Sequence, residues 1–151
     1  MRKNSIFVAR KLNEQQEMKN RDLGLLVLRL GISLMMIPHG INKLLHPEAF
    51  QYVQATLEAK GLPTVVAFGV FIAEIIAPFL LLIGFRTRLA ALIMVFNGIS
   101  ILYLAYGEKL TTFTQHGGWA PELPALFLLG ALVLCFTSGG KYALSSRNKW
   151  D

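Results

Sequence analysis

The sequence predicts an all-α integral membrane protein, a four-helix bundle with its N-terminus and C-terminus on the cytoplasmic side. The composition is the first reason: 54% of the residues are hydrophobic and only 16% are charged, whereas about 25% are charged in a typical globular protein. The second reason is that four apolar stretches approach the roughly 20 residues that a helix needs to cross a bilayer. The third is the uneven distribution of basic residues between the two sides.

The predicted membrane spans are residues 23–45, 63–85, 89–106 and 119–137. The fourth is the least apolar at its ends, because its uninterrupted apolar run covers only residues 123–136. The predicted organisation is a basic cytoplasmic N-terminal segment (1–22), a transmembrane domain (23–138) and a basic cytoplasmic tail (139–151). We expect the N-terminal segment either to lie on the inner membrane surface or to be disordered.

The charges orient the predicted bundle. Most Lys and Arg residues precede the first span, lie in the turn at 84–89 or follow the last span, whereas the opposite side has only Lys43, Lys60 and Lys109. By the positive-inside rule, both termini are then cytoplasmic. The net charge of +6 is thereby explained by topology, and we expect the lipid bilayer rather than nucleic acid as the partner of this chain.

Loop and turn residues punctuate the spans. The segment 46–62 has the spacing of an amphipathic helix that begins at Pro47 and ends at Gly61. Gly117 and Gly118 predict a turn in the loop between the third and fourth predicted spans, on the same side of the membrane as 46–62. We expect a helix break at Pro38 and a kink at Pro78, because proline lacks the N–H that a helix needs.

Three polar residues are expected in the middle of the membrane: Arg29, Glu74 and Asn97. An isolated charge at this depth is costly, so an ion pair between Arg29 and Glu74, with a hydrogen bond from Asn97, is the favoured arrangement. The pair is either purely structural or forms the wall of a binding site. The sequence leaves both alternatives open.

A second polar group is predicted at the outer end, formed by His39, Asn42, Lys43 and His46 together with His116 and Glu122. This group could bind a quinone or another polar head group and relay protons. The alternative is that Lys43 extends its ammonium to the interface and that Glu122 merely stabilises a helix N-terminus. No catalytic residue can be assigned from these patterns.

Redox and metal centres are not expected in this chain. Cys135 is the single cysteine, so no disulfide-exchange motif or C-x-x-C-H haem attachment site is present. The three histidines have no ligand spacing that predicts a metal site, and haem between His39 and His116 is disfavoured because His116 lies in a loop.

Three motifs resemble the DoxX family of small prokaryotic membrane proteins. They are "LRLGISLMMIPHGINKLL" with Arg29, Gly40 and Lys43, "AEIIAPFLLLIGFRTRLAAL" with Glu74 and a basic turn that includes Arg88, and "GGKYALSS" after the last span. The tail departs from the family pattern, since no acidic residue directly follows Ser146. The resemblance implies a four-helix protein of the prokaryotic plasma (inner) membrane and a role as an oxidoreductase component.

The leading hypothesis is a DoxX-like, quinone- or redox-linked subunit that has no redox centre of its own and acts with redox partner proteins. Quinone is the one cofactor that this hypothesis implies. A carrier or permease-like bundle for a small or lipidic molecule is the first alternative, and a structural scaffold of a membrane complex is the second. Self-association into a homo-oligomer is compatible with each. The candidate ligand-binding residues are Arg29, His39, Lys43, Glu74, Asn97, His116 and Glu122.

Overall fold

The computed structural model describes residues 2–146 and 148–151 and confirms the all-α class. The chain is 75% helical, and its described residues form no strand. The α-helices are α1 (Arg2–Leu45), α2 (Pro47–Ala59), α3 (Gly69–Phe71), α4 (Ala77–Ile83), α5 (Thr87–Leu104) and α6 (Glu122–Thr137). Two 3-10 segments, η1 (Thr64–Phe68) and η3 (Gly107–Lys109), and a π-helical turn, η2 (Ile72–Ile76), complete the helical elements.

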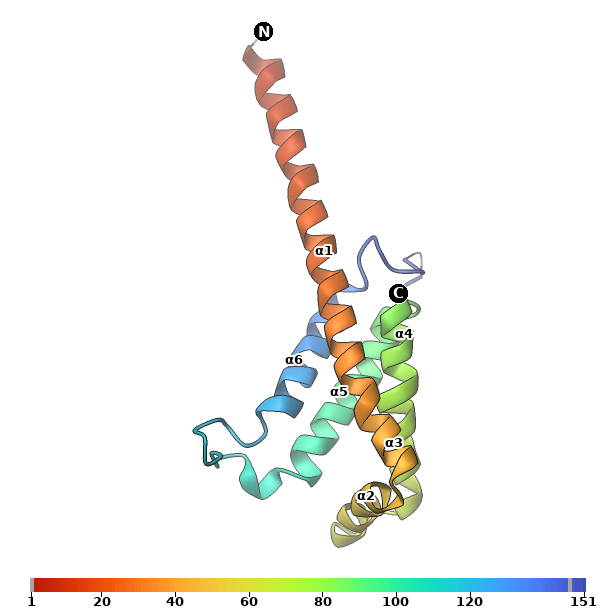
Figure 1. Ribbon diagram of the computed structural model, residues 1–151. Helices are drawn as coiled ribbons and strands as arrows, with labels where there is room; N and C mark the ends of the chain where they lie inside the picture. Colours follow the sequence, from red (N-terminus) through yellow and green to blue (C-terminus); the bar gives the residue numbers. More distant parts are fainter. Residues whose placement is uncertain (1, 147) are drawn as a thin grey trace.

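The long helices pack side by side, and α2 lies across one end of them (Figure 1). Helix α5 packs against α6, while α1 contacts α4 and α6. Alanine is common where these helices meet: Ala77, Ala90, Ala91 and Ala131 are fully buried. Such small side chains let membrane helices approach closely and gain dispersion contacts.

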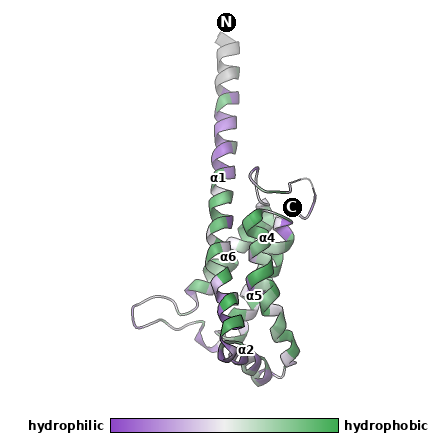
Figure 2. Cartoon of the chain, turned by 45° about the vertical axis from the view of Figure 1, so that its right-hand side comes forward, coloured by the Kyte–Doolittle hydropathy of each residue, from purple (hydrophilic) through white to green (hydrophobic). Residues whose placement is uncertain are grey.

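Large apolar side chains are exposed on the outside of the packed helices. Figure 2 shows that the residues of these helices are mainly hydrophobic. The helical segments 10–45, 64–83 and 87–104 are the three in the described chain that are long and apolar enough to span a membrane. Helix α6 has 16 residues, about 24 Å at 1.5 Å per residue, and is shorter than the roughly 30 Å hydrocarbon core. The predicted fourth span therefore stays a prediction.

Helix α1 extends far beyond the other helices at its N-terminal end (Figure 1). The side chains described between Phe7 and Arg21 are all exposed, and burial begins at Asp22. This segment is helical and continuous with the first span, so disorder is not what the structure shows. The expected break at Pro38 is also wrong, because α1 continues through Pro38 to Leu45.

The second span changes its helical geometry around Glu74. The chain passes from η1 through α3 into the π-helical turn η2, and α4 follows with Pro78 near its start. Pro78 offers no N–H to the carbonyl four residues before it, that of Glu74. A π-helical turn is one of the recognised ways in which a helix accommodates such a disruption, which agrees with the irregularity predicted at Pro78.

The segment after α6 folds back onto the turn between α4 and α5. The backbone N–H of Leu144 donates to the Ile83 carbonyl at 3.2 Å, and that of Ser145 donates to the Gly84 carbonyl at 3.1 Å. Gly84 ends α4 in the left-handed conformation, with φ of 73°, which glycine adopts without steric cost. At the other end of the molecule, the predicted helix of the 46–62 loop is confirmed as α2.

Candidate functional site: a cavity beside a buried ion pair

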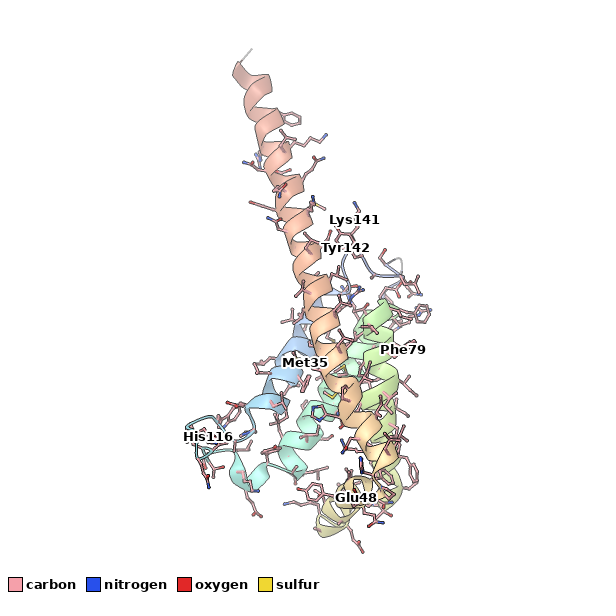
Figure 3. All side chains as sticks on the ribbon, viewed as in Figure 1. Met35, Glu48, Phe79, His116, Lys141 and Tyr142 are labelled. Atoms are coloured by element: carbon pink, nitrogen blue, oxygen red, sulfur yellow. The ribbon has the colours of Figure 1, made fainter. Side chains whose placement is uncertain are left out.

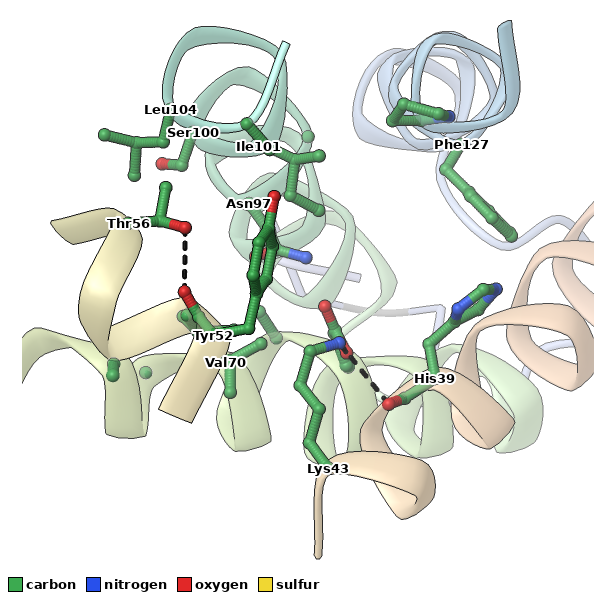
Figure 4. A pocket seen from close by; sticks show the side chains of 18 of the residues that line it. His39, Lys43, Tyr52, Thr56, Val70, Asn97, Ser100, Ile101, Leu104 and Phe127 are labelled. Atoms are coloured by element: carbon green, nitrogen blue, oxygen red, sulfur yellow. Dashed lines mark hydrogen bonds and ion pairs between the residues drawn. The ribbon is translucent and has the colours of Figure 1, made fainter. Parts of the chain in front are cut away.

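A cavity of about 780 Å³ lies between α1, α2, the second span, α5 and the start of α6 (Figure 4). Its size falls in the range of small-molecule sites, which are mostly apolar with a few polar groups. Met36, Val70, Ile93 and Phe127 are among the apolar residues that line it. The polar groups described below come from different elements and face this common space.

Lys43 and Glu74 form an ion pair on the cavity wall. The Lys43 Nζ atom donates to Glu74 Oε2 at 2.5 Å and makes a longer contact, 3.4 Å, with the His39 carbonyl. Glu74 is only 2% exposed, and the Lys43 side chain is 18% exposed. The two charges neutralise each other at a depth where either one alone would be costly.

Gly40 explains why α1 and the second span come close enough to form this pair. A Cβ atom at Gly40 would lie 2.5 Å from Ile75 Cγ1 and 3.0 Å from both the carbonyl carbon and Cβ of Glu74. Only glycine accommodates this approach of the two backbones without a shift. Lys43 follows one turn of helix later, so its side chain reaches the Glu74 carboxylate.

Two further polar residues flank the pair (Figure 4). The His39 ring packs edge-on against Phe127, with the ring centroids 5.9 Å apart. On the opposite side, Asn97 of α5 lines the cavity, and its buried Nδ2 atom has no hydrogen-bond partner in the part of the chain that the structure describes. The site thus combines a neutralised ion pair, an aromatic edge and an unsatisfied amide donor.

Helix α2 supplies one wall of the cavity through Tyr52, Val53 and Thr56. Its position is fixed by Phe50, whose ring lies 5.1 Å from the rings of both Phe68 and Phe71. Aromatic contacts of this kind add to the stabilisation from burial. The amphipathic pattern of this loop predicted a helix at the interface but not that the helix would close a cavity.

The sequence pattern of the DoxX family matches residues 24–107, which is more than half of the chain. The chain belongs to the DoxX family. No curated protein and no solved structure matches it. The DoxX match covers both residues of the ion pair as well as His39 and Asn97, whereas α6 and the C-terminal segment lie outside it.

The predicted ion pair between Arg29 and Glu74 in this DoxX chain is wrong. Glu74 pairs with Lys43 instead. Glu74 lies level with Gly40, and Gly40 is 11 residues beyond Arg29, or about 16 Å along α1. The position of each residue along its span predicts its approximate depth in the membrane. The alignment of the two spans along their axes depends instead on the contact at Gly40, which residue spacing does not reveal.

Arg29 lies instead beneath the C-terminal segment and is 1% exposed. Its Nη2 atom donates to the Tyr142 carbonyl at 3.2 Å, while Nε and Nη1 have no hydrogen-bond partner among the described residues. A Cβ atom at Gly84 would collide with the guanidinium, and one at Gly139 would lie 3.0 Å from Nη1, so both glycines leave room for it. Arg29 therefore connects the first span to the end of the DoxX chain and does not line the cavity.

The structure separates His116 and Glu122 from the cavity. His116 is exposed in the loop between η3 and α6 (Figure 3). Glu122 is the first residue of α6, and its carboxylate lies beside Gly118. Of the seven predicted ligand-binding residues, the cavity brings together His39, Lys43, Glu74 and Asn97.

Tyr52, Thr56 and Ser100 also line the cavity and were not predicted from the sequence. Tyr52 and Thr56 are four residues apart and thus share a face of α2, which was the available signal. Ser100 follows Asn97 by three residues on α5 and also shares its face.

Proposed function

We propose that this DoxX-family protein binds an amphipathic ligand inside the membrane, and that the ligand is a quinone or a similar redox-active molecule used with partner proteins. The observation that carries the proposal is the buried Lys43–Glu74 pair on the wall of a 780 Å³ cavity. Apolar walls accommodate a ring or tail, while the polar cluster accommodates the oxygen atoms of a head group.

The position of the pair supports binding over packing alone. A buried ion pair stabilises a fold poorly, and replacement by apolar residues is often neutral or favourable. Intramembrane ionisable residues commonly face a cavity and mark a ligand or ion pathway. Here the pair lies on the wall of a cavity that His39 and Asn97 also line.

Partner proteins are proposed because this chain has no recognisable redox centre of its own. The sequence has one cysteine, Cys135, and no C-x-x-C motif with which to exchange a disulfide. In a cofactor protein, the polypeptide binds and orients the cofactor, and the cofactor carries out the electron transfer. We propose a subunit that holds the quinone for a partner, in the inner membrane of a prokaryote, with both termini cytoplasmic.

The test is a quinone titration of the purified protein in lipid nanodiscs. Wild type should bind a short-tailed ubiquinone or menaquinone analogue, and Lys43→Met should weaken binding about tenfold or more, the value of a hydrogen bond from a charged donor. Lys141→Met, which removes an exposed lysine of the C-terminal segment, is the matched control. Absence of quinone from the purified protein, together with no binding by wild type, would contradict the proposal.

A carrier for a small or lipidic molecule is the second candidate function. The supporting observation is the π-helical turn that contains Glu74, because helices of irregular geometry near the midplane form the binding sites of many transporters. Proteoliposomes should then take up the molecule, and Glu74→Gln should abolish uptake while the protein remains folded. Equal uptake by wild type and Glu74→Gln would argue against the carrier.

A further inference from the structure

Asn97 is the one polar side chain on the cavity wall whose hydrogen-bonding group is both buried and without a partner in the described structure. Its Nδ2 atom carries two protons and meets no acceptor. A buried amide group without a partner is destabilising, and such a group in a folded protein calls for a specific explanation. In Figure 4 the Asn97 side chain points into the space between α5 and α1.

The Ser100 and Thr56 hydroxyls line the same cavity but, unlike the Asn97 amide, have hydrogen-bond partners. Ser100 Oγ donates to the Phe96 carbonyl at 2.8 Å, and Thr56 Oγ1 donates to the Tyr52 carbonyl at 2.7 Å. Each hydroxyl is thus satisfied by its own helix and has no need of a ligand. Among the described residues of this wall, the buried side-chain atom without a hydrogen-bond partner is a donor, Nδ2 of Asn97.

Lys43 adds a second donor across the cavity. Its ammonium group has three protons, and two acceptors are present, Glu74 Oε2 and the His39 carbonyl. The positive charge of Lys43 is neutralised by Glu74, so an anionic ligand would have to compete with that carboxylate. Two donors without a free positive charge favour a neutral molecule that presents acceptor oxygens.

We propose that Asn97 is the residue that determines ligand specificity, and that its amide donates a hydrogen bond to a carbonyl oxygen of a neutral ring compound. This inference rests on the proposed ligand-binding function and narrows the ligand to the carbonyl-bearing class. The rings of Tyr52, His39 and Phe127 border the same space (Figure 4). Such aromatic surfaces pack well against a flat ring.

Binding of three probes in nanodiscs tests the proposal: dimethylnaphthoquinone, dimethylnaphthalene and naphthoate. The quinone and the hydrocarbon share a methylated ring system and differ in the carbonyl oxygens, while naphthoate carries a negative charge. The methyl groups block addition of the Cys135 thiol to the quinone. Wild type should bind dimethylnaphthoquinone more tightly than either of the other two.

Asn97→Leu should reduce quinone affinity by about three- to tenfold, the worth of one neutral hydrogen bond, and leave hydrocarbon affinity unchanged. The same variant should keep or raise the thermal unfolding temperature, because it removes an unsatisfied buried donor. A purely structural asparagine would instead lower that temperature. Ile99→Ala is the matched control, since Ile99 lies on the same helix, is exposed and does not line the cavity, and it should bind like wild type.

The possible results separate the two proposals. If wild type binds the quinone and folded Asn97→Leu binds it equally well, Asn97 is not the donor, and the broader ligand-binding function stands. If wild type prefers naphthoate, the neutral carbonyl class is wrong. If wild type binds none of the probes, both proposals fail. Asn97→Ala provides the same comparison if Asn97→Leu does not fold.

Discussion

Replacement of Gly40 by alanine tests whether close approach of two helices creates the site. The new Cβ would be 2.5 Å from Ile75 Cγ1 and 3.0 Å from two carbon atoms of Glu74. Favourable contact between carbon atoms occurs at about 3.5–4.0 Å. The two backbones must therefore separate by about 0.5–1 Å, because the Glu74 contacts include the backbone itself.

The expected free-energy change combines two opposing terms. Overpacking of this kind costs about 1–3 kcal/mol, whereas alanine is favoured over glycine inside a helix by about 1 kcal/mol. The net loss of stability is then small, about 0–2 kcal/mol. The larger effect falls on the site, since the Lys43–Glu74 distance of 2.5 Å increases when α1 moves away.

The assay compares thermal unfolding and quinone binding of Gly40→Ala with those of Gly31→Ala. Gly31 lies on the same helix, and a Cβ there would meet nothing within 4 Å. Gly31→Ala should therefore keep wild-type binding and gain up to about 1 kcal/mol in stability. If Gly40→Ala matches Gly31→Ala in both measurements, the reasoning about helix approach is refuted.

The remaining predictions concern the pair, Arg29 and two further side chains. Lys43→Met and Glu74→Leu should each destabilise the protein by about 3–5 kcal/mol, whereas the double variant should be tolerated; chemical denaturation of all three checks this, and additive losses would contradict it. Arg29→Leu removes a hydrogen bond worth about 1.5–3 kcal/mol, so limited proteolysis should cut the segment after α6 faster; an unchanged cleavage rate would count against a clamping role. Ser33→Ala should raise the unfolding temperature, because the buried Ser33 hydroxyl has no hydrogen-bond partner, and a lower temperature would reveal a partner. Phe50→Ala should detach α2 and weaken quinone binding more than it weakens stability, with binding isotherms and thermal melts as the two measurements.

Apolar stretches and turn residues predicted most of the helical architecture. Pro47 and Gly61 bracketed α2 correctly, and the irregularity at Pro78 was expected because proline removes a backbone donor. These features depend on local physics, which a single sequence contains. The helical state of the N-terminal segment was not predicted, since its few apolar residues form no helical face.

The pairing of charges was harder to predict than their depth. Arg29, Lys43 and Glu74 were all recognised as candidates, but the wrong partner was chosen for Glu74. The choice depends on how two helices are aligned along their axes, and that alignment follows from the contact at Gly40. The unsatisfied donor of Asn97 is likewise a property of the assembled cavity, because hydrogen-bond satisfaction depends on neighbours that are distant in sequence.

The hydrogen bond from Arg29 to the Tyr142 carbonyl has a consequence for the order in which the spans insert and pack. The two residues are 113 positions apart, so the ribosome makes the intervening helices before the acceptor emerges. During insertion, the guanidinium of the first span must find water or lipid phosphate by extending along the helix. Final docking of the first span therefore waits for the segment after α6 to be synthesised. Truncation at residue 138 should thus yield protein that inserts into the membrane but is degraded sooner than the full chain.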